Sequence, residues 1–244
     1  MSEIVKLADL DAITGEAAKW WVRIAKQSVE ARGRFTVALS GGSTPQNLYQ
    51  LLASAPWSGE LPWQDTYVFF GDERRVPHSH PESNYRVAYE SLLSQVQVPA
   101  EQVFPMPGTG LARSAERDYD RVLERHFELK RGEFPRFDLM LAGLGEDGHF
   151  GSIFPGTRAV TELSGRVLIY EVPQLNRERM TLTIPVFNHA RNVVFLVSGA
   201  AKADALHNHF HAEYRPSTYP TQNIKMVDGT LTWLVDTAAA SRLE

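Results

Sequence analysis

Short apolar segments of this chain end in polar loops and are followed by segments with helical periodicity. Apolar runs of about four to eight residues, bounded by glycine or proline, are typical of buried strands. Strands that alternate with helices predict a largely parallel sheet covered by helices on both faces. We expect strands at 34–39, 66–70, 137–142, 166–172, 179–184, 192–197 and 230–235, and helices at 11–31, from 45 onward, at 82–94, at 114–129 and from 199 to about 210.

Composition limits the classes of protein that the chain can belong to. No repeat or long linker divides the 244 residues, so we expect one α/β domain over residues 1–244. The net charge of −4 gives no global basic field for nucleic acid, and an anion must therefore be bound in a local pocket. The absence of cysteine excludes disulfides, thiolate metal sites and cysteine nucleophiles. The sequence shows no signal-peptide pattern and no apolar segment near the length of a membrane span, which favours a cytoplasmic protein without membrane contact.

The loop from Gly143 to His149 follows the apolar run at 137–142 and carries the most informative side chains. Its glycines permit tight turns, and they bring two carboxylates and an imidazole to the carboxyl end of a strand. Open α/β sheets bind their ligands at that end, where a histidine can act as a base near neutral pH. An ordinary glycine-rich loop with a surface histidine explains this segment equally well when it is considered alone.

A second loop, Ser40 to Pro45, has the composition of an anion-binding site. Gly41 and Gly42 allow backbone amides to turn toward a ligand, while Thr44 is a favourable N-cap and Pro45 suits a first helical position. Free amides at a helix N-terminus favour phosphate. The loop lacks the lysine of a Walker motif, which argues against a nucleoside triphosphate. The alternative is a capped helix start with flexible glycines.

Two further loops, each directly after a predicted strand, carry positively charged side chains. Arg74 or Arg75 can bind a phosphate or carboxylate through paired N–H groups, although neighbours in an extended loop cannot both face one pocket. Ser198 is placed to cap a helix, with Lys202 one turn inside it, where a lysine opposes the helix dipole unless an anion is bound. The alternatives are a solvated salt-bridge cluster and a solvent-exposed lysine. In a parallel sheet, all of these loops share one edge.

These segments carry a resemblance to a known family. The sequence resembles the 6-phosphogluconolactonases from Leu39 to Ala239, nearly the whole chain. The resemblance implies a single-domain three-layer α/β sandwich with a mostly parallel, Rossmann-like central sheet (the NagB/RpiA-like fold), which is shared with glucosamine-6-phosphate deaminases. The matching segments are Ala38 to Pro45, Gly71 to Pro77 with Ser83-Asn84, Gly143 to His149 with Phe154 to Gly156, Arg179 to Thr183, and Ser198 to Ala203.

The resemblance also implies an activity and a set of site residues. The activity is hydrolysis of 6-phospho-D-glucono-1,5-lactone to 6-phospho-D-gluconate in the oxidative pentose phosphate pathway, without a cofactor or metal. His149 corresponds to the base that activates water, and Asp147 or Glu146 can orient its imidazole. Asp72 and Arg74 belong to the catalytic and substrate-binding set, and the phosphate-binding set comprises Ser40, Gly41, Gly42, Ser43, Thr44, Arg179 and Lys202.

The chain departs from the family pattern directly after the histidine. The family usually has Thr-Ala-Ser there, whereas this chain has Phe150-Gly151-Ser152, and Phe150 either narrows the pocket or packs beneath it. A sugar-phosphate isomerase or deaminase is one alternative, but related deaminases carry Asn-Glu-Pro where this chain has Ile153-Phe154-Pro155. A non-catalytic sugar-phosphate-binding module is the other, and the retained His149 argues against it. We expect a small sugar-phosphate lactone as substrate and a monomer or weak homodimer.

The remaining histidines do not suggest a metal site. His207, His209 and His211 alternate along a predicted helix, so their side chains point to different faces. His126 falls on the apolar face of its helix, which is typical of a histidine at the edge of the core that bonds to a neighbour.

Overall fold

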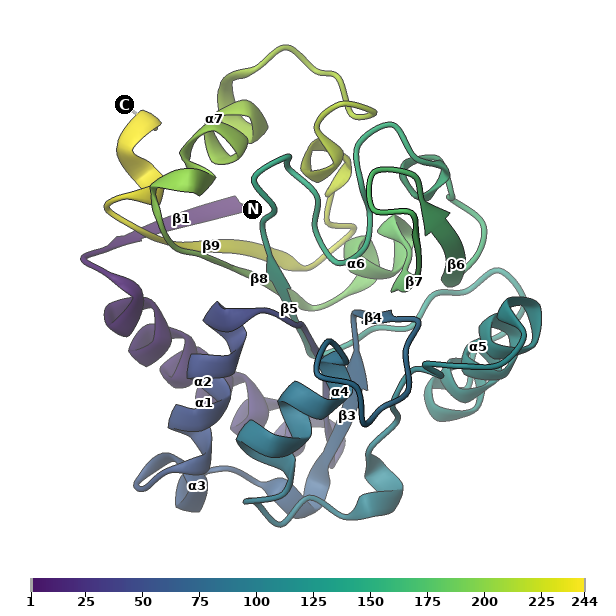
Figure 1. The fold of residues 1–244 in the computed structure, drawn as a ribbon. Coiled ribbons are helices and arrows are strands. Elements are labelled where there is room, and N and C mark those ends of the chain that lie inside the picture. Colours follow the sequence, from purple (N-terminus) through teal and green to yellow (C-terminus); the bar gives the residue numbers. More distant parts are fainter. Residues whose placement is uncertain (1, 244) are drawn as a thin grey trace.

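A six-stranded parallel sheet forms the centre of the protein, in the order β1-β9-β8-β5-β2-β3. The computed structural model describes residues 2–243 (Figure 1). The three-layer, mostly parallel arrangement predicted from the sequence is confirmed. The strands of this sheet are β1 (Ser2–Leu7), β2 (Phe35–Leu39), β3 (Thr66–Phe70), β5 (Leu139–Gly143), β8 (Asn192–Val197) and β9 (Thr230–Asp236).

Helices cover both faces of this sheet. The first two helices lie against one face, where α1 contacts β9 and β2 and α2 contacts β5 and β8. Helices α5, α6 and α7 and a small second sheet lie on the other side (Figure 1). The helices are α1 (Leu10–Arg32), α2 (Ser43–Ala53), α3 (Trp57–Glu60), α4 (Asn84–Ala88, extended by a π turn at Tyr89–Leu93), α5 (Ala112–Phe127), α6 (Ile184–His189) and α7 (Ala203–His211).

The second sheet contains the strands that lie outside the parallel layer. The segments expected at 166–172 and 179–184 form β6 (Val167–Val172) and β7 (Arg177–Leu182), an antiparallel hairpin. β7 also pairs with β4 (Asp72–Arg74), which follows β3 directly. No helix separates β6 from β7, so the chain returns through a short turn and pairs antiparallel instead of crossing over. This hairpin places Arg179 opposite Arg74.

The edge strand β1 is one of the elements that the sequence pattern did not reveal, together with β4, α3 and α6. It pairs with β9 along its whole length, but most of its side chains are exposed. Edge strands of this kind lack the continuous apolar run of a central strand. By contrast, every residue of β2 is buried, and the strand predicted from its apolar run is confirmed.

The chain reverses its direction across the sheet between β2 and β5. From β2 the chain moves to β3 at one edge, whereas from β5 it moves to β8 and then β9 on the opposite side. The loops after β2 and β5 therefore diverge, and a crevice opens between them. Ligands of open α/β sheets bind at such a switch point. Among the described residues, no helix is both long and apolar enough to span a bilayer.

Candidate active site

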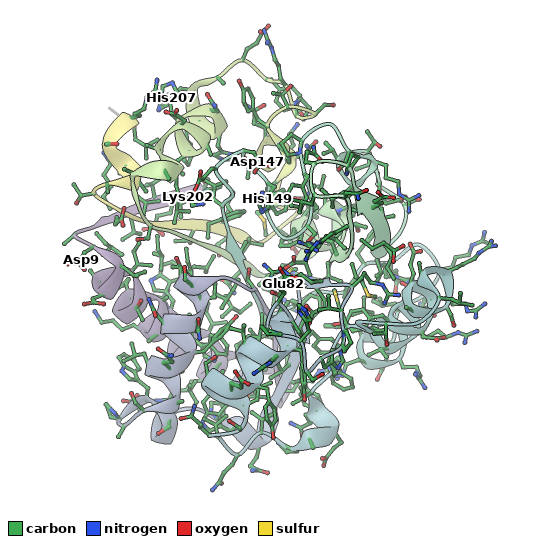
Figure 2. The ribbon with its side chains drawn as sticks, viewed as in Figure 1. Asp9, Glu82, Asp147, His149, Lys202 and His207 are labelled. Atoms are coloured by element: carbon green, nitrogen blue, oxygen red, sulfur yellow. The ribbon has the colours of Figure 1, made fainter. Side chains whose placement is uncertain are left out.

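A cavity of about 230 Å³ lies at this switch point. Its walls come from the loops that follow β2, β5 and β8, together with β4 and the start of α4. Figure 2 shows Asp147, His149 and Lys202 close together at this edge of the sheet. The lining includes Ser40, Gly41, Gly42, Ser43, Thr44, Asp72, Arg74, His149 and Lys202 from the sequence-based set, and it also includes Asn84, Gly143, Gly145, Gly151 and Ser198.

His149 is held by Asp147 and Phe154. Its Nδ1 lies 2.6 Å from Asp147 Oδ1, which also accepts the backbone N–H of His149 at 3.1 Å. The Phe154 ring stacks on the imidazole, with centroids 4.1 Å apart and planes 22° apart. Of the two carboxylates considered from the sequence, Asp147 is therefore the one that orients the ring. Because the carboxylate accepts at Nδ1, the neutral imidazole carries its proton there and leaves Nε2 as a base.

Gly145 makes this arrangement sterically possible. A Cβ at this position would lie 2.1 Å from His149 Nδ1 and 2.6 Å from Asp147 Oδ1. The Gly145 N–H donates to the His149 carbonyl at 2.7 Å, so the loop closes on itself around the imidazole. Partial burial acts to raise the pKa of Asp147, but the hydrogen bonds and charge of His149 outweigh it and bring the pKa below its ordinary value. The Asp147 carboxylate is therefore ionised and can accept the hydrogen bond from His149 Nδ1.

The loop after β2 presents backbone amides to the cavity. Tyr49 fixes its start, because the buried hydroxyl accepts the Ser40 N–H at 3.0 Å and donates to the Ser40 carbonyl at 2.7 Å. Helix α2 begins at Ser43, so the prediction of Thr44 as N-cap and Pro45 as first helical residue is wrong. Gly42 is the N-cap, with φ of 104°, a conformation that favours glycine. The first amides of α2 have no partner within the helix and remain available to an anion.

Asn84 is a lining residue that the site prediction did not include. Its Nδ2 donates to the Asp72 backbone carbonyl at 2.9 Å and to Asp72 Oδ1 at 3.2 Å. Its buried Oδ1 makes no hydrogen bond within residues 2–243. A Cβ on Gly41 would lie 1.9 Å from this oxygen, which explains the glycine. Ser152 Oγ donates to Asp72 Oδ2 at 2.6 Å, so the Asp72 carboxylate is fixed from both sides.

The fully buried Glu73 positions Asn84. Its carboxylate accepts hydrogen bonds from the backbone N–H groups of Arg74, Asn84 and Tyr85 and from Ser83 Oγ, at 2.7 to 3.0 Å. Burial raises the pKa of Glu73 above its ordinary value despite these four bonds. Glu73 therefore ties the start of α4 to β4, and with it the amide of Asn84.

The paired arginines after β3 have separate roles. Arg74 lines the cavity, and its Nη1 donates to the Glu82 carbonyl at 2.6 Å. The guanidinium of Arg75 instead donates to the carbonyl oxygens of Pro107, Thr109 and Gly110. Arg179 does not line the cavity described above, although it stands opposite Arg74 across the strand pair. Burial lowers the pKa of Arg179, and the charge of Arg74 lowers it further.

Lys202 reaches the cavity from a 3-10 turn at Ala200–Lys202 that precedes α7. Its Nζ lies 3.8 Å from Glu146 Oε1, a loose ion pair. The prediction that Ser198 caps the helix is wrong. Ser198 Oγ donates to Asp236 Oδ2 at 2.6 Å, and the Gly199 N–H donates to the same carboxylate. The turn begins at Ala200 with Gly199 as its N-cap, so Ser198 lies one residue before the cap position.

Comparison with known proteins identifies the family. Residues 8–233 match the family model of glucosamine-6-phosphate isomerases/6-phosphogluconolactonase. The chain belongs to this family. It is 45% identical over 224 residues to a 6-phosphogluconolactonase of Synechocystis sp., a match that covers 91% of this chain and 89% of that protein. Among solved structures, the devB protein superposes with a TM-score of 0.91 at 27% identity over the whole of both chains. A 6-phosphogluconolactonase from Trypanosoma cruzi gives 0.86 at 28% identity, over 100% of this chain and 97% of that one.

Phe150, where this chain departs from the family pattern, packs beneath the site. The side chain is fully buried, and its ring centroid lies 5.1 Å from that of Phe187 and 5.9 Å from that of Phe195. The next residue, Gly151, lines the cavity with φ of +52°. The bulky side chain therefore supports the loop from the core and does not narrow the pocket.

The other histidines lie outside this site. His126 is packed among Tyr67, Phe69, Phe104 and Phe127. Its Nε2 makes no hydrogen bond within the described residues, so the expected bond to a neighbour is absent. His209 packs on Trp233, whereas His207 bonds to the Arg242 carbonyl. Residues 2–243 hold no group of three or more His, Asp or Glu side chains that could bind a metal ion.

Proposed function

We propose that this protein hydrolyses 6-phospho-D-glucono-1,5-lactone to 6-phospho-D-gluconate in the oxidative pentose phosphate pathway. The observation that carries the proposal is the Asp147–His149 pair, which leaves Nε2 of a cavity-lining imidazole free beside Lys202 and the α2 amides. The 45% identity to a 6-phosphogluconolactonase over nine-tenths of the chain supports it independently.

His149 acts as general base and then as general acid. Nε2 takes a proton from water as the water oxygen attacks the lactone carbonyl carbon, C1. The bond between C1 and the ring oxygen then breaks, and the imidazolium returns the proton to that oxygen. Asp147 stabilises the imidazolium through its 2.6 Å bond to Nδ1. Proton transfer of this kind contributes about 10²–10⁴-fold to a rate.

The rest of the cavity positions the substrate. The phosphate binds to the free amides of Ser43 and Thr44 and to Lys202, which replaces its loose pair with Glu146 by a stronger one. Arg74 stabilises the oxyanion at C1, and Arg179 behind it adds to the positive potential. Asn84 holds the Asp72 carboxylate in place at the cavity wall. Binding energy at the phosphate thereby holds the ester carbon near His149.

The test is a comparison of His149→Gln with the wild type in an assay of acid release from the lactone, corrected for spontaneous hydrolysis. We expect kcat to fall about 10²–10⁴-fold with little change in KM. Asp147→Asn should retain more activity, because only the orientation and charge stabilisation of the ring are lost. Glu146→Gln, three residues from His149, is the matched control and should keep kcat near that of the wild type. Full activity in His149→Gln would refute the proposal.

The deaminase alternative is less well supported by the geometry. It requires a further proton carrier near C1 and C2 of the sugar. Phe154, at the position of the glutamate in the deaminase motif, is buried and apolar. The Asp72 carboxylate already accepts hydrogen bonds from Ser152 and Asn84. Ammonia release from glucosamine 6-phosphate would favour the deaminase over the lactonase.

A further inference from the structure

A second cavity, of about 520 Å³, lies at the opposite edge of the central sheet. It is formed where β2, β5 and β8 begin, as shown by Arg34, Asp138 and Arg191 in its wall, whereas the candidate active site lies where these strands end. The C-terminal end of α5 and the segment that follows it complete the wall with Phe127, Leu129 and Phe134. Its volume is within the range of about 300–1,000 Å³ found for small-molecule sites.

Four arginines converge on this cavity: Arg32, Arg34, Arg136 and Arg191. They face three carboxylates, those of Asp138, Asp228 and Glu133. Asp138 is nearly fully buried, and its oxygens accept hydrogen bonds from Arg32 and from the N–H and hydroxyl of Thr36. Asp228 pairs with Arg136 at 2.7 Å. The protein therefore neutralises most, but not all, of the positive charge that it gathers here.

Some guanidinium groups at this cavity have no counter-charge or incomplete hydrogen bonding. Within residues 2–243, Arg34 forms no hydrogen bond or ion pair with another side chain. The buried Nε atoms of Arg136 and Arg191 also lack hydrogen-bond partners there, although Arg191 Nε is 3.3 Å from Asp138 Oδ1. Buried donors without partners are costly, and they add to the positive charge beside the cavity, which an anion bound there would offset. Burial, with Arg136 and Arg32 nearby, lowers the pKa of Arg191, consistent with an excess of positive charge.

Flat apolar surfaces border these cations. The rings of Phe134 and His189 stack with centroids 4.9 Å apart and planes 26° apart. His189 Nδ1 donates to the Pro185 carbonyl at 2.7 Å, which fixes the orientation of its ring. Phe127 and Leu129 extend the apolar wall. A simple inorganic anion would use the arginines but leave this surface exposed to water, whereas a planar ring can stack on it.

We propose that this cavity binds a phosphate ester that carries a planar ring, of the nucleoside monophosphate class. The phosphate contacts Arg34 and Arg191, and the ring packs against Phe134 and the apolar wall. Guanidinium groups pair with phosphate through two parallel hydrogen bonds, and aromatic faces accept a base without requiring its identity. The site is separate from the proposed lactonase site, because the central strands lie between the two.

The test is calorimetric titration of the full-length protein with adenosine monophosphate. We expect Arg34→Ala to weaken binding by about tenfold or more, because a charge-assisted hydrogen bond is lost. Arg125→Ala, an exposed arginine of α5 outside the cavity, is the matched control and should bind as the wild type does. Lys202→Ala should also leave this binding unchanged. Phe134→Ala should weaken binding of adenosine monophosphate more than binding of ribose 5-phosphate.

Three outcomes would overturn the proposal. The first is no binding at about 1 mM nucleotide. The second is a loss of binding in Lys202→Ala but not in Arg34→Ala, which would place the nucleotide in the lactonase cavity. The third is equal affinity for adenosine monophosphate and ribose 5-phosphate, which would remove the role of the ring. None of these results depends on lactone hydrolysis, so failure here leaves the proposed function intact.

Discussion

The two edges of the central sheet both collect cations, but they hold them differently. At the carboxyl edge, Lys202 has one loose partner and Arg74 bonds to a backbone carbonyl. At the amino edge, Arg32 and Arg191 flank the buried carboxylate of Asp138, within a network that joins β2 to β5. The first arrangement leaves charge available to a substrate, whereas the second uses most of its charge to hold the strands together. Of the four arginines at the amino edge, Arg34 is the one without a side-chain partner within residues 2–243, so ligand binding there draws on the charge that the network does not use.

The largest expected effect is at the amino edge, in Asp138→Asn. The change leaves Arg32 and Arg191 without their shared counter-charge and places an amide where Thr36 donates two hydrogen bonds. Breaking a buried ion pair costs about 3–5 kcal/mol, and we expect the free energy of unfolding in urea to fall by this amount. Asp228→Asn removes an exposed partner of Arg136 and should cost about 1 kcal/mol or less. Equal losses in the two variants would contradict the distinction between the edges.

At the carboxyl edge, Gly145→Ala should reduce activity more than stability. The new Cβ would lie 2.1 Å from His149 Nδ1 and must displace the imidazole or Asp147. A displacement of about 1 Å at a catalytic group can cost about 100-fold, and we expect a loss of this size in kcat for the lactone. Gly15→Ala, in α1 and outside the cavity, is the control, because its Cβ would meet no described atom within 4 Å. If both variants keep wild-type kcat, the position of His149 does not limit the reaction.

Much of this site could be predicted from the sequence, because its parts are local. Each loop follows an apolar strand, and the order of strands and helices places the loop ends at one edge. The proximity of Ser40, His149 and Lys202 therefore needed no knowledge of long-range contacts. By contrast, the choice of Arg74 over Arg75 as the cavity residue depends on long-range contacts. These are the direction of β4 and the carbonyl groups at 107–110 that bind Arg75.

The features that the sequence did not reveal arise from distant partners. Ser198, which was predicted to cap a helix, instead donates a hydrogen bond to Asp236 at the end of β9. The antiparallel hairpin is fixed by its pairing with β4, about one hundred residues earlier in the chain. The amino-edge network joins Arg32 to Asp138 across 106 positions. Local periodicity carries no information about such pairs, and a strand such as β1, with one neighbour and exposed side chains, has little apolar pattern to detect.

The smallest effect that we predict is a pH dependence of stability that arises from two partly buried histidines, His126 and His209. Burial, with a smaller contribution from the charge of Arg34, lowers the pKa of His126 to about 4. The unfolded chain, with an ordinary histidine pKa of about 6.5, therefore binds more protons between pH 6.5 and 4, and the free energy of unfolding falls as the pH is lowered through that range. His126→Phe should reduce the loss between pH 7 and pH 5 by about 2 kcal/mol or less, measured by urea unfolding at both values.

His80→Phe, at an exposed loop position, should leave this pH dependence unchanged. Burial also lowers the pKa of His209 to about 4, so part of the acid sensitivity must persist in His126→Phe and disappear only when both histidines are replaced. Because neither side chain lines the candidate active site, kcat at pH 7 should not change in either variant. An unaltered pH dependence in the double variant would mean that groups other than these two histidines control acid unfolding.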